Sequence, residues 1–166
     1  MNIVEAFNKR KNLFLKKENI YSFLLIFIIF FLDRISKIKI INDFKESTFF
    51  VNDFINIELI WNTGIGFGIL SSDTALVYNL ITFLIGLVIL ILFYFAILSE
   101  FFDKFIYTII IGGAIGNYYD RIIFNAVPDF IDLHYNNFHW FIFNLADIFI
   151  TIGIIAFLIK GFFVKD

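Results

Sequence analysis

The chain has 166 residues, of which 60% are hydrophobic and 21% aromatic, and its formal net charge is −2. This composition excludes an ordinary soluble domain and predicts a single membrane-embedded domain over residues 1–166, in which lipid replaces the usual buried core. The chain has no cysteine, so disulfides, thiolate metal sites and a cysteine nucleophile are excluded as well.

The N-terminal part combines a basic segment with a short apolar run. Five basic residues precede that run: Lys9, Arg10, Lys11, Lys16 and Lys17. Because cytoplasmic flanks of membrane spans are rich in basic residues, we expect a cytoplasmic N-terminus. The run from Ile20 to Leu32 measures only about 20 Å as a helix, against about 30 Å of hydrocarbon. The first span therefore covers residues 20–41. It places Asp33 and Lys37 one turn apart as an ion pair, with the lysine expected to snorkel outward.

Residues 42–73 are mixed in polarity and predict a small extracytoplasmic β-element. Ile55–Ile60 alternates between apolar and polar residues with period two, as a half-buried strand does. The element leads into a segment with glycines at positions 64, 66 and 68. Glycines at such positions either allow close approach of the backbone to another surface or mark a bend.

Three further spans follow the β-element. They cover residues 75–98, 105–124 and 140–159. The third span reaches membrane length only by including Asp120 and Arg121 near its outer end, and the fourth carries one charged residue, Asp147, before its end. The sequence thus predicts an all-α polytopic membrane protein with four transmembrane helices, and an even number of spans places both termini in the cytoplasm.

Polar residues collect at the outer ends of the third and fourth spans. On each span they recur at helical spacing and so line one face: Asn117, Asp120 and Arg121 on the third, Asn144, Asp147 and Thr151 on the fourth. The predicted loop between these spans adds Asp129, which follows Pro128 and is therefore reached by a stiff segment. Ionisable groups against hydrocarbon cost roughly 2.5 to 3.5 kcal/mol each on insertion scales, so this cluster is a functional candidate.

Asp129 and Asp147 predict acid–base chemistry. Two carboxylates near a low-dielectric wall cannot both ionise easily, so one keeps a proton while the other is charged. Such a pair suits amide hydrolysis, in which the charged group takes a proton from the attacking water and the protonated group hydrogen-bonds the carbonyl oxygen. The alternatives are an ion pair of Asp120 with Arg121 at the helix end, which we favour for Asp120, and a helix cap for Asp147, which we do not.

Other chemistries fit the sequence less well. The lysines near the outer face form no recognisable motif with a serine. His134 and His139 lie five residues apart, without the i, i+4 spacing of a helical zinc motif, so no metal or other cofactor is expected. A small transporter or channel is the main rival, because intramembrane Asp, Asn and Arg also mark ion pathways. However, residues 105–111 and 152–159 carry no ionisable side chain that would continue such a pathway, and a structural scaffold would leave the aspartate pair unexplained.

Five motifs occur in a fixed order along the chain. They are Asp33 with Lys37, Asn62–Phe67, Gly116–Arg121, Val127–Phe130 and Phe143–Asp147. In this order they resemble the lipoprotein signal peptidase family, also called signal peptidase II, over nearly the full length of the chain. The resemblance implies four transmembrane helices with an extracytoplasmic β-cradle. It also implies an aspartic endopeptidase that removes the signal peptide before a diacylglyceryl-modified cysteine.

The resemblance further implies roles for individual residues. The catalytic aspartyl dyad would be Asp129 and Asp147. The substrate-binding residues would be Asn62, Gly64, Asn117, Arg121 and Asn144. Structural support would come from Asp33, Lys37 and Asp120.

Expected partners and location follow from the same resemblance. The partners would be lipidated prolipoproteins, membrane lipid and globomycin-type inhibitors, but not nucleic acid. The chain would be a monomer in the bacterial inner membrane, with its active site toward the extracytoplasmic face. Three departures from the family pattern concern the shape of the segment before Asp129: Gly66 replaces a usual alanine, Asn125 with Ala126 a common glycine, and Pro128 a usual aliphatic residue.

Overall fold

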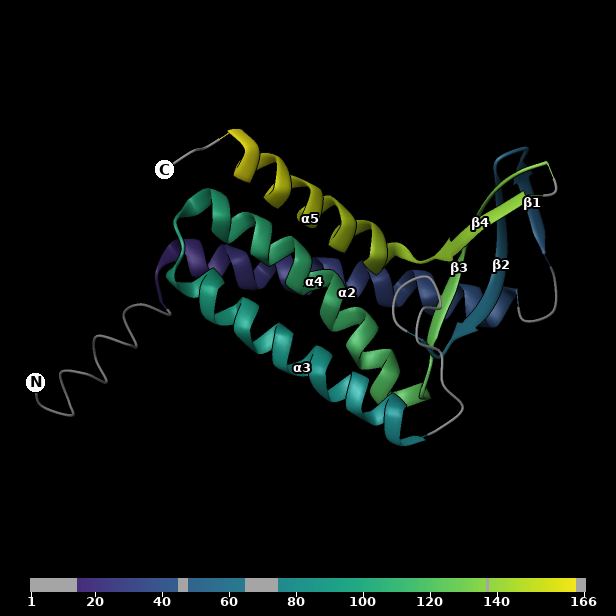
Figure 1. The fold of residues 1–166 in the computed structure, drawn as a ribbon, viewed down its shortest axis with the longest axis horizontal. Coiled ribbons are helices and arrows are strands. Elements are labelled where there is room, and N and C mark those ends of the chain that lie inside the picture. Colours follow the sequence, from purple (N-terminus) through teal and green to yellow (C-terminus); the bar gives the residue numbers. More distant parts are fainter. Residues whose placement is uncertain (1–14, 45–47, 65–74, 137, 164–166) are drawn as a thin grey trace, which may run out of the picture.

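The computed structural model describes residues 15–44, 48–64, 75–136 and 138–163. The helices are α2 (Lys17–Asp43), α3 (Ala75–Leu98), α4 (Phe101–Phe124) and α5 (Leu145–Phe163). The strands are β1 (Phe49–Asn52), β2 (Ile55–Asn62), β3 (Val127–Tyr135) and β4 (Phe138–Phe143). The helices form a bundle, and the sheet extends from one end of it (Figure 1). The start of α2 and the end of α5 lie at the opposite end of the bundle.

The central helix of the bundle is α4, which packs against α2, α3 and α5. Two glycines make these contacts close. A Cβ atom on Gly113 would lie 2.5 Å from the backbone oxygen of Ala146, and one on Gly116 would lie 2.5 Å from Asp33 Oδ2. Because no side chain fits at either position, the start of α5 and the middle of α2 lie directly against α4.

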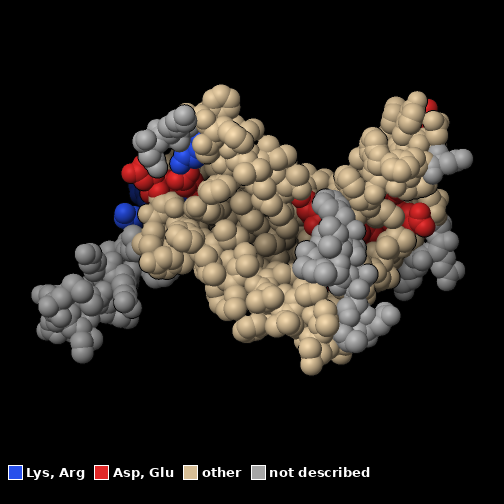
Figure 2. Space-filling view, viewed as in Figure 1, with Lys and Arg blue, Asp and Glu red and all other residues tan. Residues whose placement is uncertain are grey.

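The exterior of the bundle is apolar. Large apolar side chains such as Leu76 and Leu90 on α3 are exposed. Figure 2 shows few charged side chains over the helical body, with charged groups at the end away from the sheet and acidic groups beside the sheet. Among the described residues, α3 and α5 are the two helices long and apolar enough to cross a membrane. That α2 and α4 also cross it stays a prediction, because both carry several charged residues.

The sheet is antiparallel with strand order β1-β2-β3-β4, and it is larger than the predicted β-element. Residues 42–73 contribute only β1 and β2, so the all-α description is corrected to a helical bundle with a four-stranded sheet. The predicted start of the fourth span at residue 140 is also corrected. Phe138–Phe143 pairs with β3, and α5 begins at Leu145. A short apolar run does not by itself distinguish a strand from the start of a helix.

The connection from α4 to β3 explains one departure from the family pattern. Asn125 follows the last residue of α4 and adopts φ 54° and ψ 22°, the left-handed conformation common just after a helix. Among residues with a side chain, asparagine tolerates this conformation well, because its short polar side chain can hydrogen-bond locally. Asn125 therefore takes the place of the common glycine.

Asp129 lies in a strand rather than in the predicted loop. It occupies β3 opposite Ile60 of β2, and the neighbouring Pro128 is fully buried opposite Trp61. The stiff approach expected from the proline is thus provided mainly by pairing between strands. Pairing with β2 therefore fixes the backbone that carries this carboxyl group.

Candidate active site

Most of the predicted site residues meet where α4, the start of α5 and the sheet come together. Hydrogen bonds connect Asn62, Gly64, Asn117, Asp129, Asn144 and Asp147. These residues come from β2 and the turn after it, from α4, from β3 and from the start of α5. The fold therefore assembles one site from segments far apart in the sequence.

Asp147 is positioned by the start of α5. The Asp147 N–H donates to Asn144 Oδ1 at 3.1 Å, and the Asn144 N–H donates to Asp147 Oδ2 at 3.0 Å. This reciprocal pair is a capping box, with asparagine as the N-cap and aspartate as the third helical residue. Asp147 does cap α5, contrary to the sequence-based preference, and its second oxygen is left for other contacts. That oxygen, Oδ1, accepts a hydrogen bond from Asn117 Nδ2 at 2.7 Å.

Asp129 is 3% exposed and is held by two amides. Its Oδ2 accepts a hydrogen bond from Asn62 Nδ2 at 2.8 Å, and its Oδ1 accepts one from Asn144 Nδ2 at 2.6 Å. Burial, followed by the charge of Asp147, raises the pKa of Asp129 to about 6, although both amide contacts act in the opposite direction. Asn144 thus contacts both carboxyl groups, through its side-chain amide on Asp129 and its backbone N–H on Asp147.

Behind the two carboxyl groups lies a buried ionic cluster centred on Lys37. Its Nζ donates hydrogen bonds of 2.8 Å to Asp33 Oδ2, Asn117 Oδ1 and Asp120 Oδ2. The expected snorkelling is wrong, because this side chain is fully buried. Since Asn117 also binds Asp147, Lys37 connects the ionic cluster with the candidate site.

Asp120 pairs with α2 and not with Arg121, which corrects the favoured sequence interpretation. Its Oδ2 accepts from Lys37, and its Oδ1 accepts from Arg34 Nη1. The Arg34 guanidinium carbon also lies 5.1 Å from the ring centroid of Tyr119. Sequence reasoning missed Arg34. The available signal was a second charge beside Asp33 within a membrane-span candidate.

Asp33 joins α2 to the start of α5. While its Oδ2 pairs with Lys37, its Oδ1 accepts a hydrogen bond from the Ala146 N–H at 3.1 Å. That N–H belongs to the first turn of α5, where no carbonyl of the same helix is available. Asp33 therefore contacts both α2 and α5, and its supporting role stays a prediction.

Arg121 fastens the end of β2 to α4. Its Nη2 donates to the Gly64 carbonyl at 2.7 Å, and its Nη1 donates to the Asn117 carbonyl at 3.2 Å. The Gly64 N–H in turn donates to Asn62 Oδ1 at 2.8 Å. Arg121 and Gly64 thus orient the amide that contacts Asp129, and their direct contact with substrate stays a prediction. Gly66 lies outside the described residues.

An apolar cavity of about 230 Å³ lies beside Asp147. It is lined by Phe141, Phe143, Asp147, Ile148, Thr151 and Ile152. Thr151 shares a helix face with Asp147, as its spacing predicted. The cavity gives an apolar molecule a place next to one of the two carboxyl groups.

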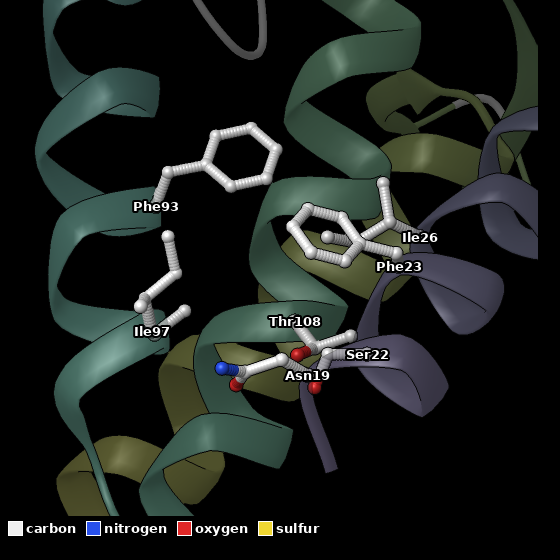
Figure 3. Close-up of a pocket in the computed structure, with 8 residues that line it drawn as sticks. Asn19, Ser22, Phe23, Ile26, Phe93, Ile97 and Thr108 are labelled. Carbon is white, nitrogen blue, oxygen red and sulfur yellow. The ribbon is translucent and has the colours of Figure 1, made fainter. Parts of the chain in front are cut away.

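A second cavity, between α2, α3 and α4, is too small for a substrate. Figure 3 shows Asn19, Ser22 and Thr108 grouped at one side of it and the rings of Phe23 and Phe93 at the other. Its volume is about 10 Å³, which is roughly the space of one water molecule. Of these two cavities, the one beside Asp147 is therefore the better candidate for substrate binding.

Two carboxyl groups that contact the same asparagine, at the end of a bundle with an apolar exterior, form a candidate acid–base site of a membrane protein. Residues 25–163 match the family model of signal peptidase (SPase) II. The chain belongs to the signal peptidase II family, and the prediction from its motifs is confirmed. It is therefore a peptidase of a bacterial membrane-protein family.

Individual relatives agree with this family. The chain is 43% identical over 153 residues to the lipoprotein signal peptidase of Pelagibacter ubique (strain HTCC1062), which covers 90% of this chain and 92% of the relative. It is 34% identical over 119 residues to the lipoprotein signal peptidase of Francisella tularensis subsp. novicida (strain U112). That match covers 69% of this chain and 74% of the relative. A solved bacterial membrane enzyme structure has a TM-score of 0.72 and 32% identity over 86% of this chain and 87% of its own. A second has a TM-score of 0.70 and 29% identity, covering 87% and 94%.

Proposed function

We propose that this peptidase removes signal peptides from diacylglyceryl-modified prolipoproteins, with Asp129 and Asp147 as its acid–base pair. The bond cleaved is the one before the lipidated cysteine. The observation that carries the proposal is the position of Asn144, which hydrogen-bonds both carboxyl groups. Family membership, and relatives named lipoprotein signal peptidase at 43% and 34% identity, support the substrate class.

Asp129 is the group that keeps a proton in the free enzyme. Burial and the charge of Asp147 raise the pKa of Asp129, so we assign the proton to Asp129 and the charge to Asp147. The place of Asp147 in the first turn of α5 favours its charged form, because a helix N-terminus attracts negative charge. Asp147 then accepts a proton from the attacking water, while Asp129 donates a hydrogen bond to the carbonyl oxygen as negative charge develops there. The leaving amine finally takes the proton that Asp147 accepted.

The cavity beside Asp147 is suited to the apolar part of the substrate. Apart from Asp147 and Thr151, its wall consists of apolar side chains. Burial of apolar surface contributes roughly 25 cal/mol per Å², so a hydrophobic segment bound here adds affinity while its neighbouring peptide bond lies at the carboxyl groups.

A direct assay tests the proposed function. The purified full-length protein is incubated with a lipidated prolipoprotein and with the same prolipoprotein lacking the lipid. We expect cleavage of the lipidated protein only, with the new N-terminus at the modified cysteine. Equal cleavage of both proteins, or a cut elsewhere, would contradict the proposed substrate class.

The pH dependence of cleavage is expected to follow Asp129. Since Asp129 acts in its protonated form, kcat/KM should fall as the pH rises through about 6. The Asn62 amide lowers the pKa of Asp129 by favouring its charged form, so Asn62→Ala should move this fall to higher pH. Profiles of kcat/KM against pH for both proteins measure the shift.

The matched control for Asn62→Ala is Asn52→Ala. Asn52 caps the exposed turn between β1 and β2 by accepting hydrogen bonds from the N–H groups of Phe54 and Ile55. Its replacement should leave the pH profile at the parental position. An unchanged pH profile in Asn62→Ala, or a shift of the profile to lower pH, would contradict the assignment of the proton to Asp129.

Arg121→Lys is expected to lower kcat/KM by about 10- to 100-fold while the protein still inserts. A single ammonium group cannot reproduce the fork that reaches the carbonyls of Gly64 and Asn117. A hydrogen bond from a charged group contributes roughly 1.5–3 kcal/mol, which gives this range. Kinetics and the yield in the membrane fraction check the two parts. If the lysine variant cleaves at the parental rate, Arg121 acts only as a charge at the helix end.

We also infer that the sheet and the site lie on the extracytoplasmic side of the bacterial inner membrane. Lys16 and Lys17 at the start of α2, and Lys160 near the end of α5, occupy the end of the bundle away from the sheet. Basic residues mark the cytoplasmic side of membrane proteins, so we expect both termini there. Binding of globomycin-type inhibitors and a monomeric state remain predictions.

Reporter fusions test this orientation. Alkaline phosphatase inserted in the turn between β1 and β2 should be active, because the enzyme requires an extracytoplasmic location, and a fusion at the C-terminus should be inactive. The reverse pattern would place the site in the cytoplasm and contradict the inferred topology.

A further inference from the structure

The sheet carries a second group of chemically active side chains, which the proposed reaction does not use. The group consists of Asp132 and His134 on β3 and His139 on β4, and one ligand atom from each lies within 4.8 Å of the others. The chain has two histidines, and both are in this group. Pairing of β3 with β4 places His134 directly opposite His139. The i, i+4 spacing expected of a helical zinc motif does not detect such a contact between strands.

This group is separate from the candidate active site. Side chains alternate between the two faces of a strand, so Asp132 and His134 share one face of β3 while Asp129 lies on the other. Asp132 is paired in register with Asn56 of β2 and with Ile142 of β4. The three residues therefore belong to the face of the sheet opposite Asp129.

Two buried polar atoms in the group lack a hydrogen bond. Asp132 is fully buried and the His134 side chain is 7% exposed. Asp132 Oδ1 and His134 Nδ1 nevertheless have no hydrogen-bond partner. Buried polar atoms are nearly always satisfied, and an unsatisfied one costs free energy. A bound cation would satisfy a carboxylate oxygen and an imidazole nitrogen together.

The distances in the group are close to those of a metal site. His139 Nδ1 lies 2.8 Å and His134 Nδ1 lies 3.7 Å from Asp132 Oδ2. Tetrahedral Zn²⁺ with ligand bonds of about 2.0–2.2 Å needs ligand atoms roughly 3.3 Å apart, which falls between these values. All three ligand atoms lie within 4.8 Å of one another, so the three side chains are within reach of one ion. Asn56 Nδ2 donates to Asp132 Oδ2 at 3.4 Å and supports this carboxylate from outside.

We propose that Asp132, His134 and His139 bind one divalent transition-metal ion of the Zn²⁺ type. Two imidazoles and one carboxylate are a donor set that such ions accept, with water in a fourth position. The half-exposed side chain of His139 leaves that position open to solvent. The bound ion ties β4 to β3, the strand that carries Asp129, and so stiffens the sheet beneath the site.

Metal titration of the full-length protein tests the proposal. The protein is purified in detergent with an affinity tag that contains no histidine, treated with a chelator, and titrated with Zn²⁺ and with Co²⁺ as a spectroscopic probe. We expect one ion per chain, visible d–d absorption of bound Co²⁺, and a rise in melting temperature on Zn²⁺ addition. These readouts do not involve cleavage, so their failure is distinguishable from failure of the proposed peptidase function.

Three variants identify the ligands. His134→Gln and His139→Gln should each abolish stoichiometric binding and the Co²⁺ spectrum, while Asn56→Ala should weaken Zn²⁺ binding by about 10- to 100-fold through loss of outer support. The Asn56 variant keeps all three ligands and so remains informative if a histidine variant folds poorly. Absence of saturable binding to the parent, or binding unchanged in both histidine variants, would overturn the proposal.

Discussion

Asp129→Asn and Asp147→Asn are each expected to lower kcat/KM for prolipoprotein cleavage by about 10²- to 10⁴-fold. Asparagine keeps the size of the side chain, but it can neither accept a proton from water nor donate a carboxyl proton. Because the two groups act on one reaction step from different elements, neither can replace the other. The double variant should be about as inactive as either single variant, since groups that act as a unit do not lose activity additively. Kinetics on the four proteins measure this directly.

Asp103→Asn is the matched control for these substitutions. Asp103 lies on α4 at the end away from the sheet, where it pairs with Lys160 at 2.5 Å in a partly exposed site. The same chemical change there should leave kcat/KM close to the parental value. Asp132→Asn does not serve this purpose, because Asp132 is fully buried in the sheet. Cleavage by Asp129→Asn at the parental rate would contradict the assignment of these residues as an acid–base pair. So would a loss in the double variant equal to the product of the two single losses.

Lys37→Met is expected to produce the largest loss of stability among single substitutions in the site region. Methionine approximates the length of the lysine, but it removes the ammonium group that neutralises Asp33 and Asp120. Breaking a buried ionic cluster by removing one partner costs roughly 3–5 kcal/mol. For a chain of this size that corresponds to a fall in melting temperature on the order of 10 °C. Thermal unfolding in detergent, followed by helical circular dichroism, measures it.

Lys39→Met is the control that separates the effect of removing a buried lysine from the effect of removing any lysine. Lys39 lies on the same helix two residues later, and its side chain is exposed. Its replacement should change the melting temperature by no more than the small effect of an isolated surface substitution. If Lys37→Met has the same melting temperature as the parent protein, the buried ionic cluster does not stabilise the bundle.

The parts of the fold that could be predicted rest on local signals. The uncharged run of residues 75–98 predicted a helix with the bounds that α3 has. The spacing of Asn144 and Asp147 predicted a shared helix face, and both residues join the polar site. The family itself could be predicted because five motifs occur in order, although each is weak alone.

The parts that could not be predicted depend on contacts between distant residues. Lys37 and Asp120 are separated by 83 positions, so the sequence offers only the local partner Asp33 and suggests an exposed pair. β4 is a run of aromatic and apolar residues that also fits the start of a membrane span. Its strand state follows from pairing with β3, which no local pattern reveals.

The capping box at the start of α5 links the proposed catalysis to the fraying of a single helical turn. Asn144 and Asp147 hold each other through the hydrogen bonds that begin this helix, and Asn144 also holds Asp129. If that turn unwinds, both carboxyl groups lose their contacts with Asn144 at once, even while the rest of the bundle stays intact. We therefore expect activity to be lost when this turn unwinds, so that a protein whose helices are otherwise intact is already inactive.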